Sequence, residues 1–128
     1  MFQEKALAIL KSRKNVFLTG SAGTGKTYTL NQYIKWLKDH KVPVAITAST
    51  GIAATHMNGT TIHSWSGIGI KDSLSLDNLK SLATKQYLTK NLRNTHILII
   101  DEISMLHLNQ LDMVNRVLKY IRNSAQPF

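Results

Sequence analysis

The chain has 128 residues, with 16 Lys and Arg against seven Asp and Glu, a formal net charge of +9 and no cysteine. This length suits one compact α/β domain, and the absence of cysteine excludes disulfides and cysteine-ligated zinc. A balance this basic favours polyanionic partners, nucleic acid first among them, although a basic surface without such a partner is equally compatible with the charge.

Targeting and membrane segments are not evident in the sequence. No apolar run approaches the roughly 20 residues that a membrane-spanning helix needs, so we expect no membrane association. The first ten residues, MFQEKALAIL, lack the basic flank, apolar block and cleavage site of a secretory signal. We therefore expect a protein of a reducing, cytoplasmic-type compartment.

Helical and strand-like patterns alternate in the first half of the chain. Apolar residues at helical spacing predict a helix over 2–13, and the short β-favouring run Asn15–Thr19 predicts a buried strand. A second helix is expected over Thr27–His40. Val42–Ala48 predicts a second buried strand, which a loop, a short helix and an Asn58-Gly59 turn follow.

The second half continues the alternation. Two short helices are expected around 76–84 and 85–92, and His96–Ile100 predicts a third strand. Apolar residues then repeat every three or four positions, which predicts an amphipathic helix from Ser104 to about Arg122. Strands that alternate with helices in this way predict an α/β fold, a parallel sheet with right-handed crossovers.

Residues 20–27, GSAGTGKT, match the phosphate-binding loop G-x-x-x-x-G-K-[ST], the Walker A motif. Its glycines let successive backbone N–H groups surround an anion, and the helix that follows adds its positive end. Lys26 would reach the β- and γ-phosphates, and the Thr27 hydroxyl would ligate Mg²⁺. The expected nucleotide-binding residues are Gly20, Ser21, Ala22, Gly23, Thr24, Gly25, Lys26, Thr27 and Tyr28. A glycine-rich turn without a ligand is the alternative, whereas Tyr28 in place of a third glycine argues against a dinucleotide fold.

Asp101 and Glu102 end the third strand, so that residues 97–102 form a Walker B motif. A carboxylate at a strand tip can hold Mg²⁺, and a second one can polarise the attacking water. We therefore expect Lys26, Asp101 and Glu102 to be catalytic, with Thr27 and Asp101 at the metal. An acidic helix start is the alternative. A glutamate here favours hydrolysis over phosphoryl transfer, which makes a kinase the weakest interpretation.

The segment 49–66 begins at the carboxyl end of the second strand, the edge where ligands bind in open parallel sheets. Small residues there let a nucleic-acid backbone approach, and Ser49 and Thr50 can donate to phosphate. Capping of a helix by Thr50 and Gly51 is a compatible alternative. His63 and Trp65 could stack on bases or contact phosphate, although a tryptophan that holds the loop down is as well supported.

Three stretches, FLTGSAGTGKT, ITASTGIAATHMNGTTIHSWSGIG and ILIIDEISML, together resemble the petite-integration-frequency (PIF) family of superfamily-one 5′→3′ DNA helicases and their RecD-like relatives. The resemblance covers nearly the whole chain and implies a P-loop NTPase of the RecA-like fold, with ATP and Mg²⁺ as ligands and single-stranded DNA as partner. Gln3 matches the family glutamine that contacts adenine. The DNA contacts implied or favoured for this chain are Ser49, Thr50, Gly51, Ala53, His63 and Trp65. The expected location is the cytoplasm with the nucleoid in a bacterium or virus, or the nucleus in a eukaryote.

The family's motor continues beyond the features found here. Its first RecA-like domain adds a strand between the phosphate-loop strand and the Asp101 strand, and a second RecA-like domain supplies arginines for ATP hydrolysis. We therefore expect residues 1–128 to form a C-terminally incomplete first domain with unpaired strand edges. By itself it would be monomeric, bind ATP·Mg²⁺ weakly, hydrolyse it negligibly and unwind nothing. Another P-loop ATPase of DNA metabolism, such as a helicase loader or AAA-type protein, and a non-catalytic nucleotide- or DNA-binding module are the alternatives.

Overall fold

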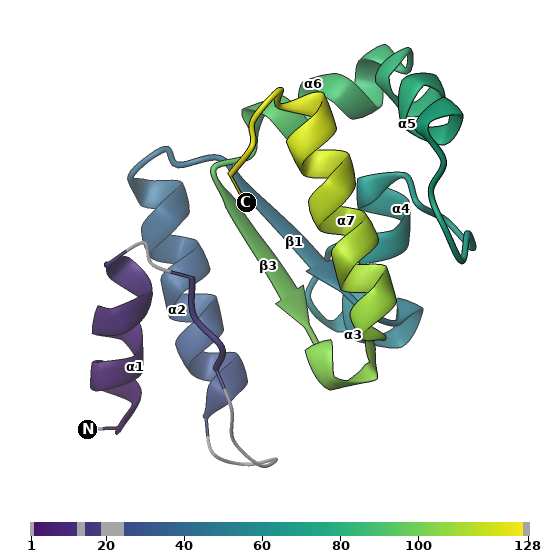
Figure 1. The fold of residues 1–128 in the computed structure, drawn as a ribbon. Coiled ribbons are helices and arrows are strands. Elements are labelled where there is room, and N and C mark those ends of the chain that lie inside the picture. The colour runs from purple at the N-terminus through teal and green to yellow at the C-terminus, as the bar shows by residue number, and fades with distance from the viewer. Residues whose placement is uncertain (1, 13–14, 19–24, 127–128) are drawn as a thin grey trace. The chain divides into compact units, whose positions relative to one another are not determined.

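The protein is described here by a computed structural model that covers residues 2–12, 15–18 and 25–126, without the side chains of residues 2–4. Its contacts divide the chain into two compact units, an N-terminal unit (Met1–Val44) and a C-terminal unit (Ala45–Phe128). The N-terminal unit is helical, whereas the C-terminal unit contains a small sheet with its helices (Figure 1).

The N-terminal unit consists of two packed helices, α1 (Phe2–Lys11) and α2 (Lys26–Asp39). Both lie where the apolar periodicity predicts them. The buried residues of α2 are Thr29, Tyr33, Ile34 and Leu37. Trp36 lies under the Lys11 ammonium, whose Nζ is 5.3 Å from the ring centroid, and its ring centroid is 4.3 Å from that of His40. This cation–π contact joins the end of α1 to the last turns of α2.

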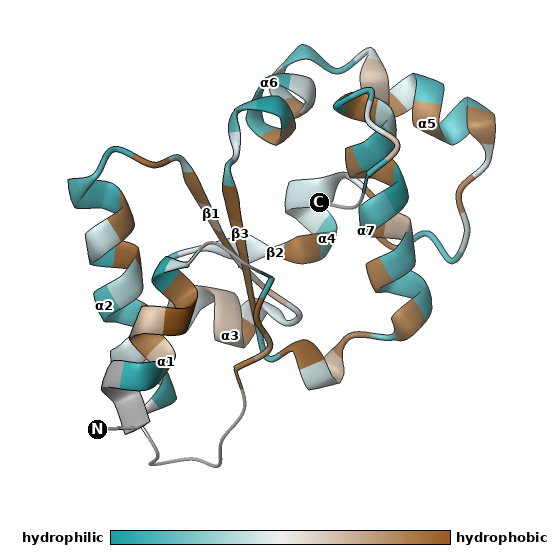
Figure 2. Ribbon diagram, turned by 60° about the vertical axis from the view of Figure 1, so that its left-hand side comes forward, coloured by the Kyte–Doolittle hydropathy of each residue, from teal (hydrophilic) through white to brown (hydrophobic). Residues whose placement is uncertain are grey.

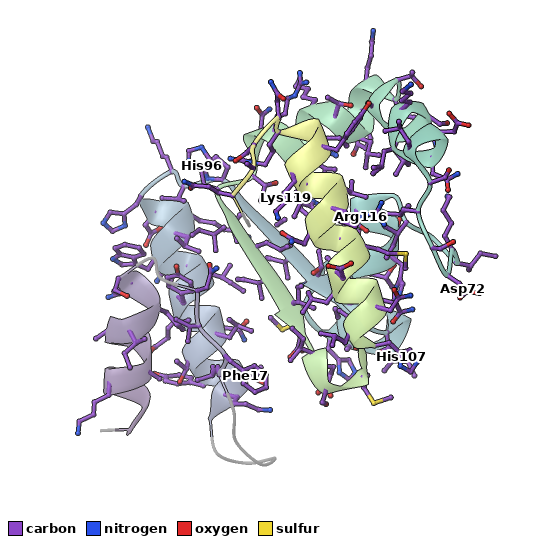
Figure 3. All side chains as sticks on the ribbon, in the orientation of Figure 1. Phe17, Asp72, His96, His107, Arg116 and Lys119 are labelled. Atoms are coloured by element: carbon purple, nitrogen blue, oxygen red, sulfur yellow. The ribbon has the colours of Figure 1, made fainter. Side chains whose placement is uncertain are left out.

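The predicted strand Asn15–Thr19 is wrong for residues 15–18, which form neither strand nor helix; Thr19 lies outside the described residues. Phe17 is 69% exposed (labelled in Figure 3) and Val16 is 38% exposed. A β-favouring sequence forms a strand only beside a partner that pairs its backbone groups. Over the part of the chain that the structure describes, the sheet contains three strands, none of which is this segment.

The sheet consists of β1 (Val44–Ala48), β2 (Thr60–Thr61) and β3 (Ile97–Asp101), in the order β2-β1-β3. Its strands run parallel (Figure 1), which confirms the predicted parallel α/β sheet. The register places Thr47 opposite Thr60 and Ala48 opposite Thr61. β1 begins two residues later than expected, and β2 was not expected, because a two-residue strand has no alternating pattern to detect.

Five further α-helices and a short 3-10 helix complete the described chain. They are α3 (Gly51–His56), α4 (Ile62–Ser66), α5 (Leu76–Ala83), α6 (Gln86–Asn94), the 3-10 helix η1 (Ile103–Met105) and α7 (Leu108–Ile121). The helix that was predicted to start at Ser104 is thus divided into η1 and α7. Within residues 2–12, 15–18 and 25–126, no helix is long and apolar enough to cross a membrane.

The main core of the C-terminal unit lies where helices α4–α7 cover one face of the sheet. Its buried members are Ile62, Ile68, Leu74, Leu79, Leu82, Leu92, Met113, Val114, Val117, Leu118 and Ile121. Leu98 and Ile100 of β3 pack against this core. The apolar colouring of β1 and β3 in Figure 2 agrees with strands that are covered by helices. This packing fixes the edge of the sheet at which β3 ends.

The C-terminal ends of α6 and α7 are joined by two arginines. Arg122 Nη1 donates to the carbonyl groups of Leu92, Arg93 and Thr95, at distances of 3.1, 3.3 and 3.1 Å. In return, Arg93 Nε donates to the carbonyl of Ile121 at 3.0 Å. Each guanidinium thus satisfies carbonyl groups that the partner helix leaves without an intrahelical donor, and its positive charge suits the negative end of that helix.

Candidate functional site

The phosphate-binding loop is described only at its carboxyl end, because Gly20–Thr24 lie outside the described residues. Gly25 has φ 86° and ψ 14°, a left-handed conformation that glycine adopts without steric cost. Its carbonyl accepts from Thr29 N at 2.9 Å and so begins α2. The last glycine of the loop therefore turns the chain directly into a helix of 14 residues.

Lys26 and Thr27 are the first two residues of α2, whose first turn contains no acidic residue. The first N–H groups of a helix lack intrahelical acceptors and lie at its positive end, which favours an anion there. Within the described part of the chain the Thr27 hydroxyl makes no hydrogen bond, so it is available as a ligand oxygen. The Tyr28 hydroxyl accepts from Gln32 Nε2 at 2.8 Å on the exposed side of the helix.

Gln3, the expected adenine contact, lies in the first turn of α1. Its side chain is outside the described part of the structure, so its role stays a prediction.

Asp101 ends β3, and Glu102 follows it in an uncommon backbone conformation. Glu102 has φ 54° and ψ 45°, a left-handed combination that is uncommon outside glycine, and Lys41, Asn58 and Asn123 share its positive φ. Asp101 Oδ1 accepts from Glu102 N at 3.0 Å. The Asp101 side chain is half-buried and the Glu102 side chain is exposed, so both carboxylates remain accessible at this edge of the sheet.

These carboxylates fit a hard divalent cation. Among the described residues, neither Asp101 nor Glu102 forms an ion pair with a lysine or arginine, and one Asp101 oxygen is left over from the bond to Glu102 N. The same part of the chain contains no group of three His, Cys, Asp or Glu side chains that could enclose a metal. A cation with one or two protein oxygens and several waters or phosphates as ligands is the arrangement that Mg²⁺ prefers.

Ser49 meets the Asp101–Glu102 pair directly. Its backbone N donates to the carbonyl of Asp101 at 3.1 Å, and its hydroxyl donates to the carbonyl of Glu102 at 2.6 Å. The sequence predicts Ser49 as a DNA-contacting residue. No local pattern indicates its hydrogen bond to Glu102, because Glu102 is 53 positions away. The structure thus brings the start of segment 49–66 together with the end of the Walker B strand.

Thr50 caps α3, as one interpretation of the sequence had it. Its backbone is extended, and its hydroxyl accepts from Ala53 N at 3.2 Å. Ala53 is buried in a small cluster with Ala48 and Ala54, whereas Gly51 is exposed. The segment therefore presents the start of a short helix next to the carboxyl end of β1.

The TTIHSWS stretch forms β2 and α4. The Thr61 hydroxyl caps α4 by accepting from Ser64 N at 3.2 Å. Trp65 packs against the main core, which supports its structural interpretation, and His63 is half-buried with no ring hydrogen bond among the residues that the structure describes. The Asn58-Gly59 turn is confirmed: Asn58 has φ 54°, and a Cβ on Gly59 would overlap the Ile46 carbonyl. Glycine thus permits the close approach of this turn to β1.

Comparison with known proteins identifies relatives over the whole segment. A model of the family described as PIF1-like helicase matches residues 3–128. The chain is 65% identical over 128 residues to the ATP-dependent DNA helicase Pif1 of Psychrobacter sp. (strain PRwf-1). The aligned region covers 100% of this chain and 19% of that protein. The chain therefore spans about a fifth of the length of this relative.

Solved structures of Pif1 helicases also match nearly the whole chain. The crystal structure of Pif1 helicase from Candida albicans superposes with a TM-score of 0.91 at 39% identity, over 98% of this chain and 29% of that one. Pif1 helicase from Bacteroides, in complex with ADP-AlF3 and ssDNA, superposes with a TM-score of 0.83 at 33% identity, over 98% of this chain and 28% of that one. These matches confirm the predicted RecA-like fold, and the chain belongs to the PIF1-like helicase family.

Proposed function

We propose that the chain is the ATP-binding portion of an ATP-dependent DNA helicase that moves along single-stranded DNA. This proposal rests on the pair of accessible carboxylates, Asp101 and Glu102, at the end of β3. In the same chain, α2 begins with the lysine and threonine of a phosphate-binding loop. Such a pair is suited to hydrolysis, because one carboxylate binds the metal and the other orients water.

Each residue of the proposed ATP site has a distinct role. The loop 20–27 would surround the phosphates with N–H groups, and Lys26 would neutralise their charge. Thr27 and Asp101 would hold Mg²⁺, which neutralises charge on the β- and γ-phosphates when it is bound. Glu102 would accept a proton from the attacking water and orient that water toward the γ-phosphorus.

The proposed DNA contact is the segment 49–66. It lies at the carboxyl edge of the parallel sheet, the usual ligand edge of this fold class, and the chain has a net charge of +9. Ile52 in the first turn of α3 is 75% exposed, and Gly51 leaves open space on the same turn. A complex of the Bacteroides relative with ssDNA supports the same partner for this chain.

The rest of the motor is proposed to lie outside this segment. Residues 1–128 correspond to 19% of the Psychrobacter relative. The resemblance to the family implies that the arginines for ATP hydrolysis come from a second RecA-like domain. We expect residues 1–128 by themselves to be monomeric and to bind ATP·Mg²⁺ weakly.

Binding and unwinding assays on a full-length chain that contains this segment test the proposal. A fluorescent ATP analogue should bind in the presence of Mg²⁺, and a duplex with a 5′ single-stranded tail should be unwound when ATP is added. Lys26→Ala should abolish both, whereas Lys38→Ala, near the other end of α2, should abolish neither. DNA binding that is insensitive to ATP and to Lys26→Ala, without hydrolysis, would instead identify a non-catalytic binding module.

A further inference from the structure

The Ser49 hydroxyl lies between the DNA segment 49–66 and the proposed catalytic residue Glu102. We propose that Ser49 is a positioning residue, which holds Glu102 in its hydrolytic arrangement when DNA occupies the segment 49–66. This inference rests on the proposed function and adds to it the route by which single-stranded DNA would stimulate ATP hydrolysis.

Three hydrogen bonds fix the backbone around Glu102. The Glu102 carbonyl accepts from the Ser49 hydroxyl at 2.6 Å and from Met105 N at 3.0 Å, so both of its acceptor positions are used. Glu102 N donates to Asp101 Oδ1 at 3.0 Å. One of the two groups on the carbonyl belongs to η1, which follows Glu102 directly, and the other belongs to Ser49, which follows the neighbouring strand β1. Ser49 is thus the long-range restraint on this residue.

The backbone conformation of Glu102 makes that restraint necessary. A non-glycine residue at φ 54° is strained relative to the helical and extended regions, and it persists where surrounding contacts determine it. Without the Ser49 bond, the peptide after Glu102 would be free to relax, and the direction of the carboxylate would change with it. Catalysis by a general base depends steeply on such placement.

Ser49 is also covalently joined to the DNA segment. Thr50, the next residue, caps α3 with its hydroxyl, so a ligand that orders the start of α3 also orders Ser49. One further hydrogen bond upstream holds β1 and β3 in register, because the buried Thr47 hydroxyl donates to the Ile99 carbonyl at 2.6 Å. A shift of the start of α3 would therefore also move Glu102, because β1 and β3 are held in register.

The alternative role of Ser49, as a donor to a DNA phosphate, competes for the same proton. A serine hydroxyl has one hydrogen, and in the structure the Glu102 carbonyl accepts it. The two roles predict different kinetics. A positioning residue affects the rate at saturating DNA, whereas a phosphate contact affects the affinity for DNA.

The test measures ATP hydrolysis by the full-length chain with and without saturating oligo(dT), together with the affinity for that oligonucleotide. Ser49→Ala should lower the DNA-stimulated kcat about fivefold to tenfold, the value of one neutral hydrogen bond, and leave the KM for ATP and the DNA Kd within about twofold. Ser49→Thr, which keeps the hydroxyl, should retain at least about half of the stimulated kcat.

Thr84→Ala is the matched control. The Thr84 hydroxyl donates to the Ser81 carbonyl at 2.6 Å, the same length as the Ser49 bond, but at the exposed end of α5. This variant should behave as the unmodified protein in every measurement. If Ser49→Ala does not fold, Ser49→Cys takes its place, because it keeps the shape with a weaker donor, and the same lowered kcat is expected.

Two results would overturn the inference. One is an unchanged stimulated kcat in Ser49→Ala. The other is a DNA Kd weakened about tenfold with kcat restored at saturating DNA, which would make Ser49 a phosphate contact. A different failure, no stimulation by oligo(dT) in the unmodified protein, would contradict the proposed function itself.

Discussion

Glu102 combines an expected chemical role with an unexpected backbone. Its left-handed conformation has a cost of about 1–3 kcal/mol for a residue with a Cβ, and no local sequence pattern indicates it. The conformation persists because Ser49, Asp101 and Met105 all bond to its peptide groups. A strained residue at a site of proposed catalysis agrees with the general tendency of such strain to occur where function requires a fixed geometry.

Replacement of this carboxylate by an amide separates binding from hydrolysis. In a full-length chain, Glu102→Gln should lower kcat for ATP hydrolysis by about 10²–10⁴, because a general base is lost, while the affinity for ATP stays within a few fold. Steady-state hydrolysis and binding of a fluorescent ATP analogue measure the two quantities. Asp112→Asn, on the exposed side of α7, is the control. A Glu102→Gln variant with more than a tenth of the original kcat would exclude the proposed role.

Gly25 offers a second test at the residue level. With φ 86° it occupies a region where an alanine costs about 1–2 kcal/mol, so Gly25→Ala should weaken ATP binding about fivefold to thirtyfold. Gly51→Ala is the matched glycine control, because it has no positive φ and an added Cβ would meet no atom within 4 Å. Equal ATP affinities of the two variants would show that the described turn is not needed for the site.

At the level of elements, the reciprocal arginines join α6 and α7. Arg122→Ala should lower the free energy of unfolding by about 1.5–3 kcal/mol, since three backbone carbonyls lose a charged donor. Urea unfolding followed by circular dichroism measures this change. The control is Lys119→Ala, also on α7 (labelled in Figure 3), because the Lys119 side chain makes no hydrogen bond or ion pair with the residues that the structure describes. Equal losses in the two variants would contradict a capping role for Arg122.

Some elements could be predicted from the sequence because their signal is local. The helices α2 and α7 repeat apolar residues over 14 positions each, and the Asn58-Gly59 turn contains its own conformational preference. β2 has two residues and gives no alternation. The segment 15–18 has a strand-like composition, but a strand also needs a neighbour, and sequence composition does not say whether one is there.

Part of the candidate site could likewise be predicted from the sequence, and part of it could not. The positions of Lys26, Thr27, Asp101 and Glu102 at a helix start and a strand end follow from motif spacing, and the structure places them there. The Ser49–Glu102 hydrogen bond could not be predicted, because it depends on the register of two strands whose residues are 53 positions apart. Long-range register is fixed by packing, which local patterns do not encode.

At the scale of the whole molecule, the chain corresponds to 19% of the length of its Psychrobacter relative. A polypeptide of residues 1–128 should hydrolyse ATP at least about 10³-fold more slowly than that full-length relative in saturating oligo(dT), because an arginine supplied by another domain is worth about 10³–10⁵ in rate. Phosphate release measures both rates. Comparable turnover by residues 1–128 would mean that this segment contains every group that the reaction needs.

The central claim is that this segment provides the ATP site of a motor that DNA stimulates. Its most direct test is the rate of ATP hydrolysis by a full-length chain that contains the segment, measured as oligo(dT) is titrated. The account predicts a rate that rises to saturation with oligo(dT) and falls to background in the Lys26→Ala variant. A rate that is independent of oligo(dT), or one that Lys26→Ala leaves unchanged, would contradict it.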